Sequence, residues 1–290
     1  MTRFVTRFVS FALVLMLINE AWAGRFWANL ERVSEPFMVT PHDMTLTPDG
    51  RYLVVADMGQ DRILLLDPEL LTIAGIIGAK DLSLPHDVIF DKDDRLLVAD
   101  SGNDRIVIYD LQDTKARMVG TIDGLNGPEG IAAGPQGRLY VSATMEDRVV
   151  CIRDGVIEAS ADSALGMALD RPHDIEVRQD ATGLSIIATD PGNHRLVAFD
   201  QNLRPKFEIS TWDPPFSEPK YISHDQQGRL YVADQYNNVI RIFSTGAAPL
   251  GTFGSTHVKL PEGIYVDGDR AWVSDTERGR ILLYRLGETP

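Results

Sequence analysis

A pattern of 42 to 47 residues occurs six times along this 290-residue chain. The copies open at six prolines: Pro41, Pro85, Pro128, Pro172, Pro219 and Pro261. Each copy contains three short apolar runs rich in β-branched residues, separated by tight-turn residues, as residues 84–110 illustrate. Such runs predict strands rather than helices. A repeat of this length with several strands is typical of one blade of a β-propeller.

The tail of each period supplies a fourth strand, expected at residues 73–77, 117–122, 156–159, 206–209 and 249–253. One blade cannot bury both faces of its own sheet, so the copies are expected to stack around a ring. The last copy ends without a fourth strand, and residues 25–33 have no other assigned place. We therefore predict that this N-terminal segment closes the last blade. The alternative is a loose leader beside an incomplete blade, which would leave an open sheet edge.

Two of the loops carry a family resemblance. Residues 100–106 (DSGNDRI) and 190–196 (DPGNHRL) resemble the NHL repeat, and the similarity extends over roughly residues 36–284. The resemblance implies an all-β fold, a six-bladed β-propeller. It does not identify a function, because this scaffold supports many.

The first 23 residues differ from the rest of the chain. Arg3 and Arg7 precede an 11-residue apolar run at residues 8–18, and Ala21-Trp22-Ala23 fits a signal-peptidase site. We predict a signal peptide over residues 1–23, cut after Ala23, and a single propeller domain over residues 24–290. The protein is then expected in the periplasm or outside the cell. The alternative, an uncleaved membrane anchor, is disfavoured because the apolar run is too short to span a bilayer.

The charge of the chain restricts its partners. The formal net charge is −14, which argues against a nucleic-acid partner, since phosphate binding requires an excess of Lys and Arg. We expect a monomer that is not an integral membrane protein and that binds a small molecule or peptide, with a protein partner also open.

The residue after each opening proline is expected near the central channel, because the first strand of a blade is innermost. These residues are His42, His86, Glu129, His173, Lys220 and Glu262. In alternate blades, His86, His173 and Glu262 form a two-histidine, one-carboxylate set suited to zinc or iron. His42 would be a fourth ligand or a base, and the aspartates that follow three of the histidines would orient the imidazoles. The alternative is a hydrated channel mouth in which each histidine bonds a carbonyl or water.

This placement of histidines resembles a narrower family, peptidyl-α-hydroxyglycine α-amidating lyase (peptidylamidoglycolate lyase). That resemblance implies a six-bladed propeller whose zinc is held by three Pro-His ligands in alternate blades. His86 and His173 match two ligands, whereas the third falls on Glu262. The family's tyrosine falls on Met145 and its arginine on Met58, while Tyr236 has the right local setting in a different blade.

Three functions follow as hypotheses. The first is an exported metal-dependent lyase or hydrolase, with His42 and Tyr236 as catalytic candidates. The second is a non-catalytic propeller that binds a protein, peptide or envelope component on the same face. The third is a lactonase-like propeller, which the histidine-rich ring disfavours because calcium prefers oxygen ligands. A pair repeated four times, Asp-x4-Arg, is expected to be a structural clip across a loop rather than a catalytic pair.

Overall fold

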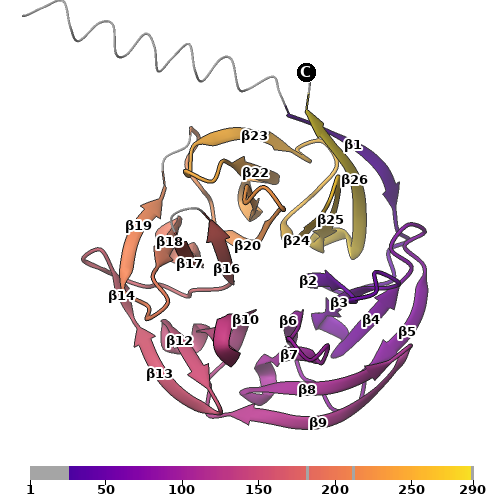
Figure 1. The fold of residues 1–290 in the computed structure, drawn as a ribbon. Helices are drawn as coiled ribbons and strands as arrows, with labels where there is room; N and C mark the ends of the chain where they lie inside the picture. The colour runs from indigo at the N-terminus through magenta and orange to yellow at the C-terminus, as the bar shows by residue number, and fades with distance from the viewer. Residues whose placement is uncertain (1–25, 181–182, 211–212, 289–290) are drawn as a thin grey trace, which may run out of the picture.

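The computed structural model describes residues 26–180, 183–210 and 213–288. Six four-stranded antiparallel sheets are arranged as blades around a central channel (Figure 1). We number the blades 1 to 6 in the order of their innermost strands. The all-β, six-bladed propeller expected from the sequence is therefore confirmed. The expected signal peptide lies outside the described residues.

The innermost strands are β2 (Pro41–Leu46), β6 (Pro85–Phe90), β10 (Pro128–Ala133), β16 (Ile175–Asp180), β20 (Pro219–His224) and β24 (Pro261–Asp267). The second strands are β3 (Leu53–Asp57), β7 (Leu96–Asp100), β11 (Arg138–Ala143), β17 (Gly183–Asp190), β21 (Leu230–Asp234) and β25 (Arg270–Asp275). The third strands are β4 (Arg62–Leu66), β8 (Arg105–Gln112), β12 (Arg148–Arg153), β18 (Arg195–Phe199), β22 (Val239–Phe243) and β26 (Arg280–Glu288).

The outer strands are β5 (Ile73–Ile77), β9 (Lys115–Asp123), β13 (Val156–Ala161), β19 (Pro205–Ile209), β23 (Pro249–Phe253) and β1 (Phe26–Val33). A small hairpin, β14 (Ser163–Ala164) with β15 (Met167–Ala168), lies between blades 3 and 4. One-turn 3₁₀ segments are η1 (Met58–Gln60), η2 (Ser101–Asn103), η3 (Pro135–Gly137), η4 (Thr144–Glu146), η5 (Pro191–Asn193), η6 (Gln235–Asn237) and η7 (Thr276–Arg278). No helix in the described ranges is long and apolar enough to cross a membrane.

The ring is closed by its two ends. Strand β1 pairs antiparallel with β26, from Phe26 opposite Glu288 to Val33 opposite Leu282, so the last blade contains the order β1-β26-β25-β24. Phe26 and Leu30 pack against the apolar cluster between blades 5 and 6. The predicted closure by the N-terminal segment is confirmed.

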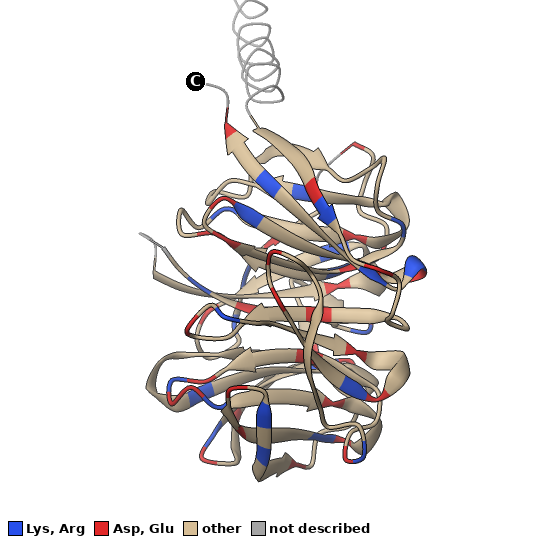
Figure 2. Cartoon of the chain, turned by 90° about the vertical axis from the view of Figure 1, so that its right-hand side faces the viewer, with Lys and Arg blue, Asp and Glu red and all other residues tan. Residues whose placement is uncertain are grey.

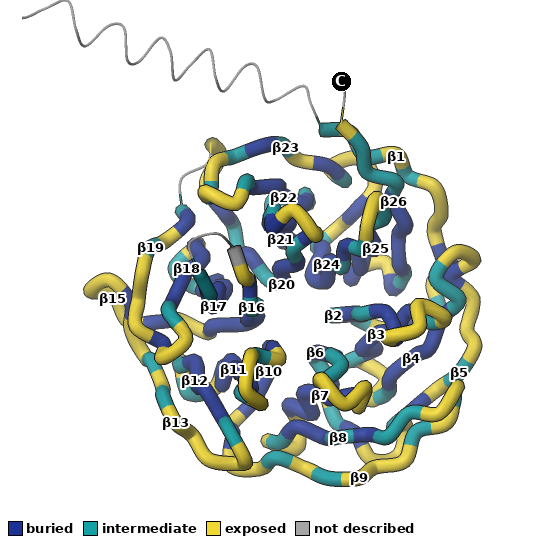
Figure 3. Tube along the Cα trace, in the orientation of Figure 1, coloured by how far each residue is buried: buried dark blue, intermediate teal, exposed yellow. Residues whose placement is uncertain are grey.

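Burial follows the position of a strand in its blade. Strands β3 and β7 are buried at every residue, whereas β5 is mostly exposed, and Figure 3 shows exposed residues concentrated on the rim. Apolar side chains of adjacent blades interdigitate in six clusters, which is the burial that a single sheet cannot achieve alone. On the side of the ring seen in Figure 2, basic residues are interspersed with acidic ones.

The repeated Asp-x4-Arg pairs are clips, as expected. Asp100 Oδ2 accepts a 2.7 Å bond from Arg105 Nε, and its Oδ1 accepts a 2.6 Å bond from the backbone nitrogen of Ser83. The same carboxylate thus ties its own third strand to the link from the preceding blade. Equivalent ion pairs of 2.7 to 2.8 Å occur at Asp57–Arg62, Asp190–Arg195 and Asp275–Arg280. In blade 5, Arg241 pairs with Asp234 in place of the arginine that the pattern lacks.

Candidate metal centre

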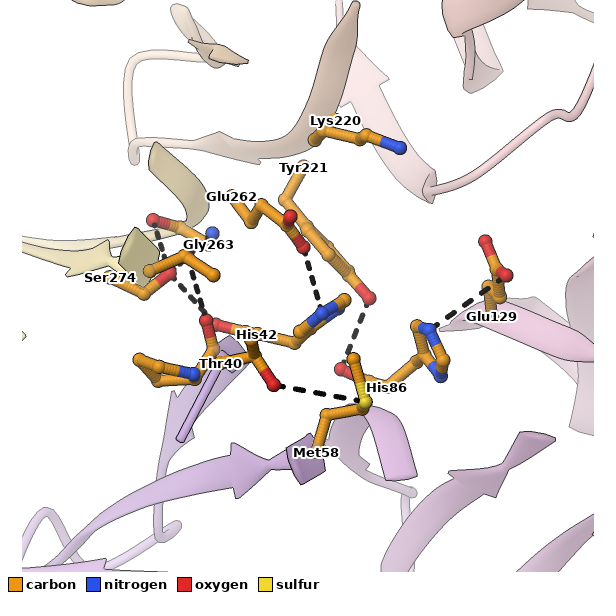
Figure 4. Close-up of polar contacts among 12 residues, drawn as sticks. Thr40, His42, Met58, His86, Glu129, Lys220, Tyr221, Glu262, Gly263 and Ser274 are labelled. Atoms are coloured by element: carbon orange, nitrogen blue, oxygen red, sulfur yellow. Dashed lines mark hydrogen bonds and ion pairs between the residues drawn. The ribbon is translucent and has the colours of Figure 1, made fainter. Parts of the chain in front are cut away.

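The residue after each opening proline lies at a distortion of its strand. In β2, β6, β20 and β24 the pairing register shifts between the proline and the residue three positions later. Such bulges re-aim side chains and are frequent beside functional sites. In blade 4 the strand begins only at Ile175, and His173 N bonds Thr189 O at 3.3 Å. In β10 the register shifts between Pro128 and Gly130. The ring residues therefore face the channel mouth from locally irregular backbone, and Figure 4 shows His42, His86, Glu129, Lys220 and Glu262 there.

Three of the ring residues form a compact group. One ligand atom from each of His42, His173 and Glu262 lies within 4.8 Å of the others. The exposed fractions are 4%, 4% and 9%, so the group is nearly closed to solvent. His42 Nε2 lies 2.9 Å from Glu262 Oε2. Two imidazoles and one carboxylate form a donor set that suits zinc or ferrous iron.

Several atoms of this group lack a hydrogen-bond partner. Among the described residues, Nδ1 of His42 and Nδ1 of His173 are buried without one, whereas Glu262 Oε2 has His42 Nε2 at 2.9 Å. Buried polar atoms are nearly always satisfied, so unpartnered ones indicate a water, an ion or a functional role. Two such atoms in one group favour a bound species there.

His86 lies beside this group rather than in it. Its Nδ1 is 2.8 Å from the carbonyl oxygen of Leu84, which turns the ring so that Nε2 faces Glu129 at 3.8 Å. The centroid of its ring is 4.5 Å from that of His42. The sequence predicted a ligand set of His86, His173 and Glu262. In the structure the compact group contains His42 in place of His86.

Blade closure also positions His42. Ser274, in blade 6, donates a 3.0 Å hydrogen bond to the carbonyl oxygen of His42 in blade 1. The same hydroxyl accepts a 2.6 Å bond from Gly263 N, directly after Glu262. One side chain thus fixes the backbone of two members of the group (Figure 4).

Gln235 is a site residue that the sequence reasoning missed. At its position in three other blades, a hydroxyl bonds the carbonyl of the next opening proline, as Thr144 does to Pro172 at 2.7 Å and Thr276 does to Pro41 at 2.8 Å. Gln235 instead donates a 2.5 Å bond from Nε2 to Glu262 Oε1. The sequence signal for this residue was a glutamine at a position where three other blades have serine or threonine.

The electrostatic environment keeps two imidazoles neutral. Burial, followed by repulsion from His42, lowers the pKa of His86 to about 3. Burial and then the charge of Lys220 hold the pKa of His173 well below its usual value. Burial by itself would raise the pKa of Glu262, but His42, Lys220 and His86 together lower it. Neutral imidazoles and an ionised carboxylate are the forms that bind a metal ion.

Tyr221 forms the floor of the centre. From blade 5 it crosses the channel, and its hydroxyl donates a 3.1 Å bond to the carbonyl oxygen of His86 in blade 2. Its ring centroid lies 4.8 Å from that of His173 and 6.1 Å from that of His42, both edge-on. The mouth is thereby separated from the acidic layer beneath it.

That layer contains Asp43, Asp87 and Asp174. The expectation that these carboxylates orient the imidazoles is wrong for Asp87 and Asp174: Asp87 Oδ2 accepts a 2.6 Å bond from Ile131 N and Asp174 Oδ2 a 2.7 Å bond from Ile222 N, each in the next blade. Both carboxylates are thus directed at the backbone of the neighbouring blade rather than at the imidazoles. Burial is the main cause that raises the pKa of all three, that of Asp87 to about 7.

The opposite end of the channel is a separate cavity of about 480 Å³. It is lined by the later residues of the six inner strands and includes Glu176 and His224, which form an ion pair. His224 therefore faces the far end of the ring, as predicted. The hydrogen bond to Glu176 raises the pKa of His224.

Tyr236, a catalytic candidate from the sequence, lies in η6 with 57% of its surface exposed. Its neighbour Gln235, and not Tyr236, is the η6 residue that contacts the compact group. Met145, where the lyase family has a tyrosine, is 71% exposed.

Comparisons with known proteins agree with this architecture. Residues 82–109 match the NHL repeat family, and residues 114–144 match the family described as strictosidine synthase-like, N-terminal. A search of curated protein sequences finds no match to the chain.

Three solved structures share the fold at low identity. A catalytically inactive virginiamycin B lyase from Staphylococcus aureus with quinupristin is 15% identical, with a TM-score of 0.61 over 84% of this chain and 80% of that one. A streptogramin B lyase is 15% identical, with a TM-score of 0.62 over 91% and 98%. A gluconolactonase from Xanthomonas campestris is 16% identical, with a TM-score of 0.68 over 87% and 88%. The chain is thus a six-bladed β-propeller that contains an NHL repeat.

Proposed function

We propose that this protein is a metal-dependent lyase or hydrolase whose divalent ion, zinc or iron, is held by His42, His173 and Glu262. The observation that carries the proposal is the compact group itself: three buried residues each place one ligand atom within 4.8 Å of the others, and Nδ1 of both histidines is buried without a hydrogen-bond partner. When bound, such an ion would polarise a substrate oxygen or activate water.

The residues around the group have separate roles in this proposal. Gln235 holds the second oxygen of Glu262 and so orients the carboxylate, as the outer hydrogen bonds of metal ligands commonly do. His86 is neutral, because burial lowers its pKa to about 3, and its Nδ1 is engaged by Leu84 O. Its Nε2 can therefore hydrogen-bond a substrate, but it is too weak a base to take a proton near neutral pH. His42 takes the ligand role that the sequence had favoured for His86. Tyr221 closes the floor against water from the channel.

A lyase related to peptidylamidoglycolate lyase remains the finer form of this proposal. The two histidines that match that family both lie in the ring, and two solved propellers of similar fold are named as lyases. We also propose that the protein is exported to the periplasm or secreted, on the pattern of residues 1–23.

The test is elemental analysis of purified protein and of single variants. We expect wild type to retain about one equivalent of zinc or iron, whereas His42→Ala and His173→Ala lose it, because removing one of three ligands weakens binding steeply. His86→Ala should keep the metal, and so should the matched control His257→Ala, in a loop outside the group.

Two outcomes would change the conclusion. Loss of metal in His86→Ala with retention in His42→Ala would restore the alternate-blade ligand set. A folded wild-type protein that binds neither metal would refute the enzyme proposal and favour a propeller that binds a protein, peptide or envelope component without catalysis.

A further inference from the structure

Lys220 is the one cationic side chain among the six ring residues. It enters from blade 5, between blade 4, which supplies His173, and blade 6, which supplies Glu262. Its side chain is 15% exposed, so the ammonium group is largely withdrawn from bulk water. Figure 4 shows it directed into the opening between Glu262 and Glu129. The position is adjacent to the compact group but outside it.

The ammonium group forms only a long ion pair. Among the described residues, its nearest carboxylate oxygen is Glu218 Oε2, 3.8 Å away, which is beyond hydrogen-bond distance. The other oxygen of Glu218 is engaged by Arg171 Nη2 at 2.8 Å. Among the described residues, no hydrogen bond involves Lys220 Nζ. A lysine ammonium has three donors, and a largely buried one whose donors reach no acceptor of the described residues within hydrogen-bond distance is suited to bind an external anion.

The charge of Lys220 acts on the atoms of the centre. It contributes to lowering the pKa of His173 and His86, and also that of Glu262. A divalent cation held by His42, His173 and Glu262 would be repelled by this neighbouring ammonium. An anionic group placed between the two cations removes that repulsion and is attracted by both.

The charges of the six ring residues, counted with a metal ion bound, also favour an anionic ligand. Apart from the three histidines, the ring contains the carboxylates of Glu129 and Glu262 and the ammonium of Lys220. A bound dication would leave one net positive charge in a mouth that belongs to a protein of net charge −14. The mouth would then attract a single negative charge.

We infer that the substrate is a small carboxylic acid whose carboxylate is bound by Lys220 while a neighbouring oxygen lies at the metal centre. The inference rests on the proposed function. A carboxylate fits better than a phosphate, because a dianion with three or four acceptor oxygens requires several donors and Lys220 is the only ring ammonium. Lys220 is then a specificity-determining residue.

The test compares acetate, its neutral isostere acetamide and inorganic phosphate, with binding to purified protein measured by NMR. In Lys220→Met we expect acetate affinity to fall about ten- to hundredfold, the range for a hydrogen bond to a charged group. Acetamide binding should not change. The matched control is Lys259→Met, which removes an exposed lysine already paired with Glu277 at 3.0 Å. Lys220→Gln provides a second variant if the methionine variant does not fold.

Metal content, measured on the same samples, separates this inference from the proposed function. Lys220→Met should retain the metal at least as tightly as wild type, because a repelling charge has been removed. Retained metal with equal acetate affinity in wild type and Lys220→Met would overturn the inference and leave the proposed function intact. Acetate binding that depends on Lys220, by a protein that binds no metal, would refute the proposed function and support the role of Lys220 in carboxylate binding. Phosphate binding tighter than acetate, with the same dependence on Lys220, would overturn the assignment to carboxylates.

Discussion

Gln235 shows how one departure from a repeat creates a functional position. Where other blades use Ser101, Thr144 or Thr276 to hold the next opening proline, this longer side chain reaches past the backbone to Glu262. The bond both satisfies one oxygen of a buried carboxylate and directs the other toward His42. The repeat places this residue beside the next blade, and the longer amide side chain allows it to reach the carboxylate of Glu262.

Replacing Gln235 with leucine should weaken metal retention about ten- to hundredfold, the usual cost of losing a hydrogen bond behind a metal ligand. The free energy of unfolding should fall by about 1 to 3 kcal/mol, because Glu262 Oε1 is left buried without its donor. Competition with a chelator measures the first effect and thermal denaturation the second.

Ser101→Ala is the matched control, since it removes a bond between two blades at the equivalent position, away from the three ligand residues. Equal metal affinity in Gln235→Leu and wild type would show that Glu262 does not depend on this amide.

At the scale of strands, the inner strands approach closely because two positions lack a side chain. A Cβ atom on Gly263 would lie 2.2 Å from the carbonyl oxygen of His42, and one on Gly130 would lie 2.6 Å from that of His173. Both glycines directly follow a ring residue. The backbone of each histidine therefore packs against a glycine of another blade, which brings the imidazoles into a narrow mouth.

Gly263→Ala should therefore displace the backbone of His42. We expect a loss of about 1 to 3 kcal/mol in stability, typical of overpacking, together with reduced metal content. Gly246→Ala is the control, because the nearest atom to its added Cβ would be 3.9 Å away. Equal stability and metal content in both variants would mean that the inner strands can separate without cost. Thermal denaturation with elemental analysis provides both measurements.

At the scale of the whole molecule, the centre depends on closure of the ring. His42 belongs to blade 1 and Glu262 to blade 6, and these blades adjoin only because β1 and β26 complete the last sheet. The hydrogen bond from Ser274 to His42 spans 232 residues of sequence. The group of His42, His173 and Glu262 is therefore expected to form only when the ring of blades closes.

Deleting residues 26–33 should expose the edge of β26 and uncover part of the cluster between blades 5 and 6. We expect a loss of at least about 3 kcal/mol, comparable to truncating a large core side chain, and association through the free edge. Size-exclusion chromatography and thermal denaturation would detect both effects. A chain that starts at Gly24 is the control, and equal behaviour of the two chains would contradict a role for β1 in closure.

The sequence by itself determined the repeat, the blade number, the Asp-x4-Arg clips and the N-terminal closure. These features follow from hydrophobic alternation, turn residues and regular spacing, which act over short distances and can be seen in the order of residues. The same spacing placed all six ring residues at the channel mouth.

Only the tertiary structure decided which ring residues meet. His86 is turned aside by its bond to Leu84 O, His42 is fixed by Ser274, Glu262 is oriented by Gln235, and Tyr221 reaches across the channel. All but the first of these contacts join different blades, and all depend on side-chain direction. Periodicity sets where a backbone passes, but the hydrogen bonds formed after the ring closes set where each side chain points.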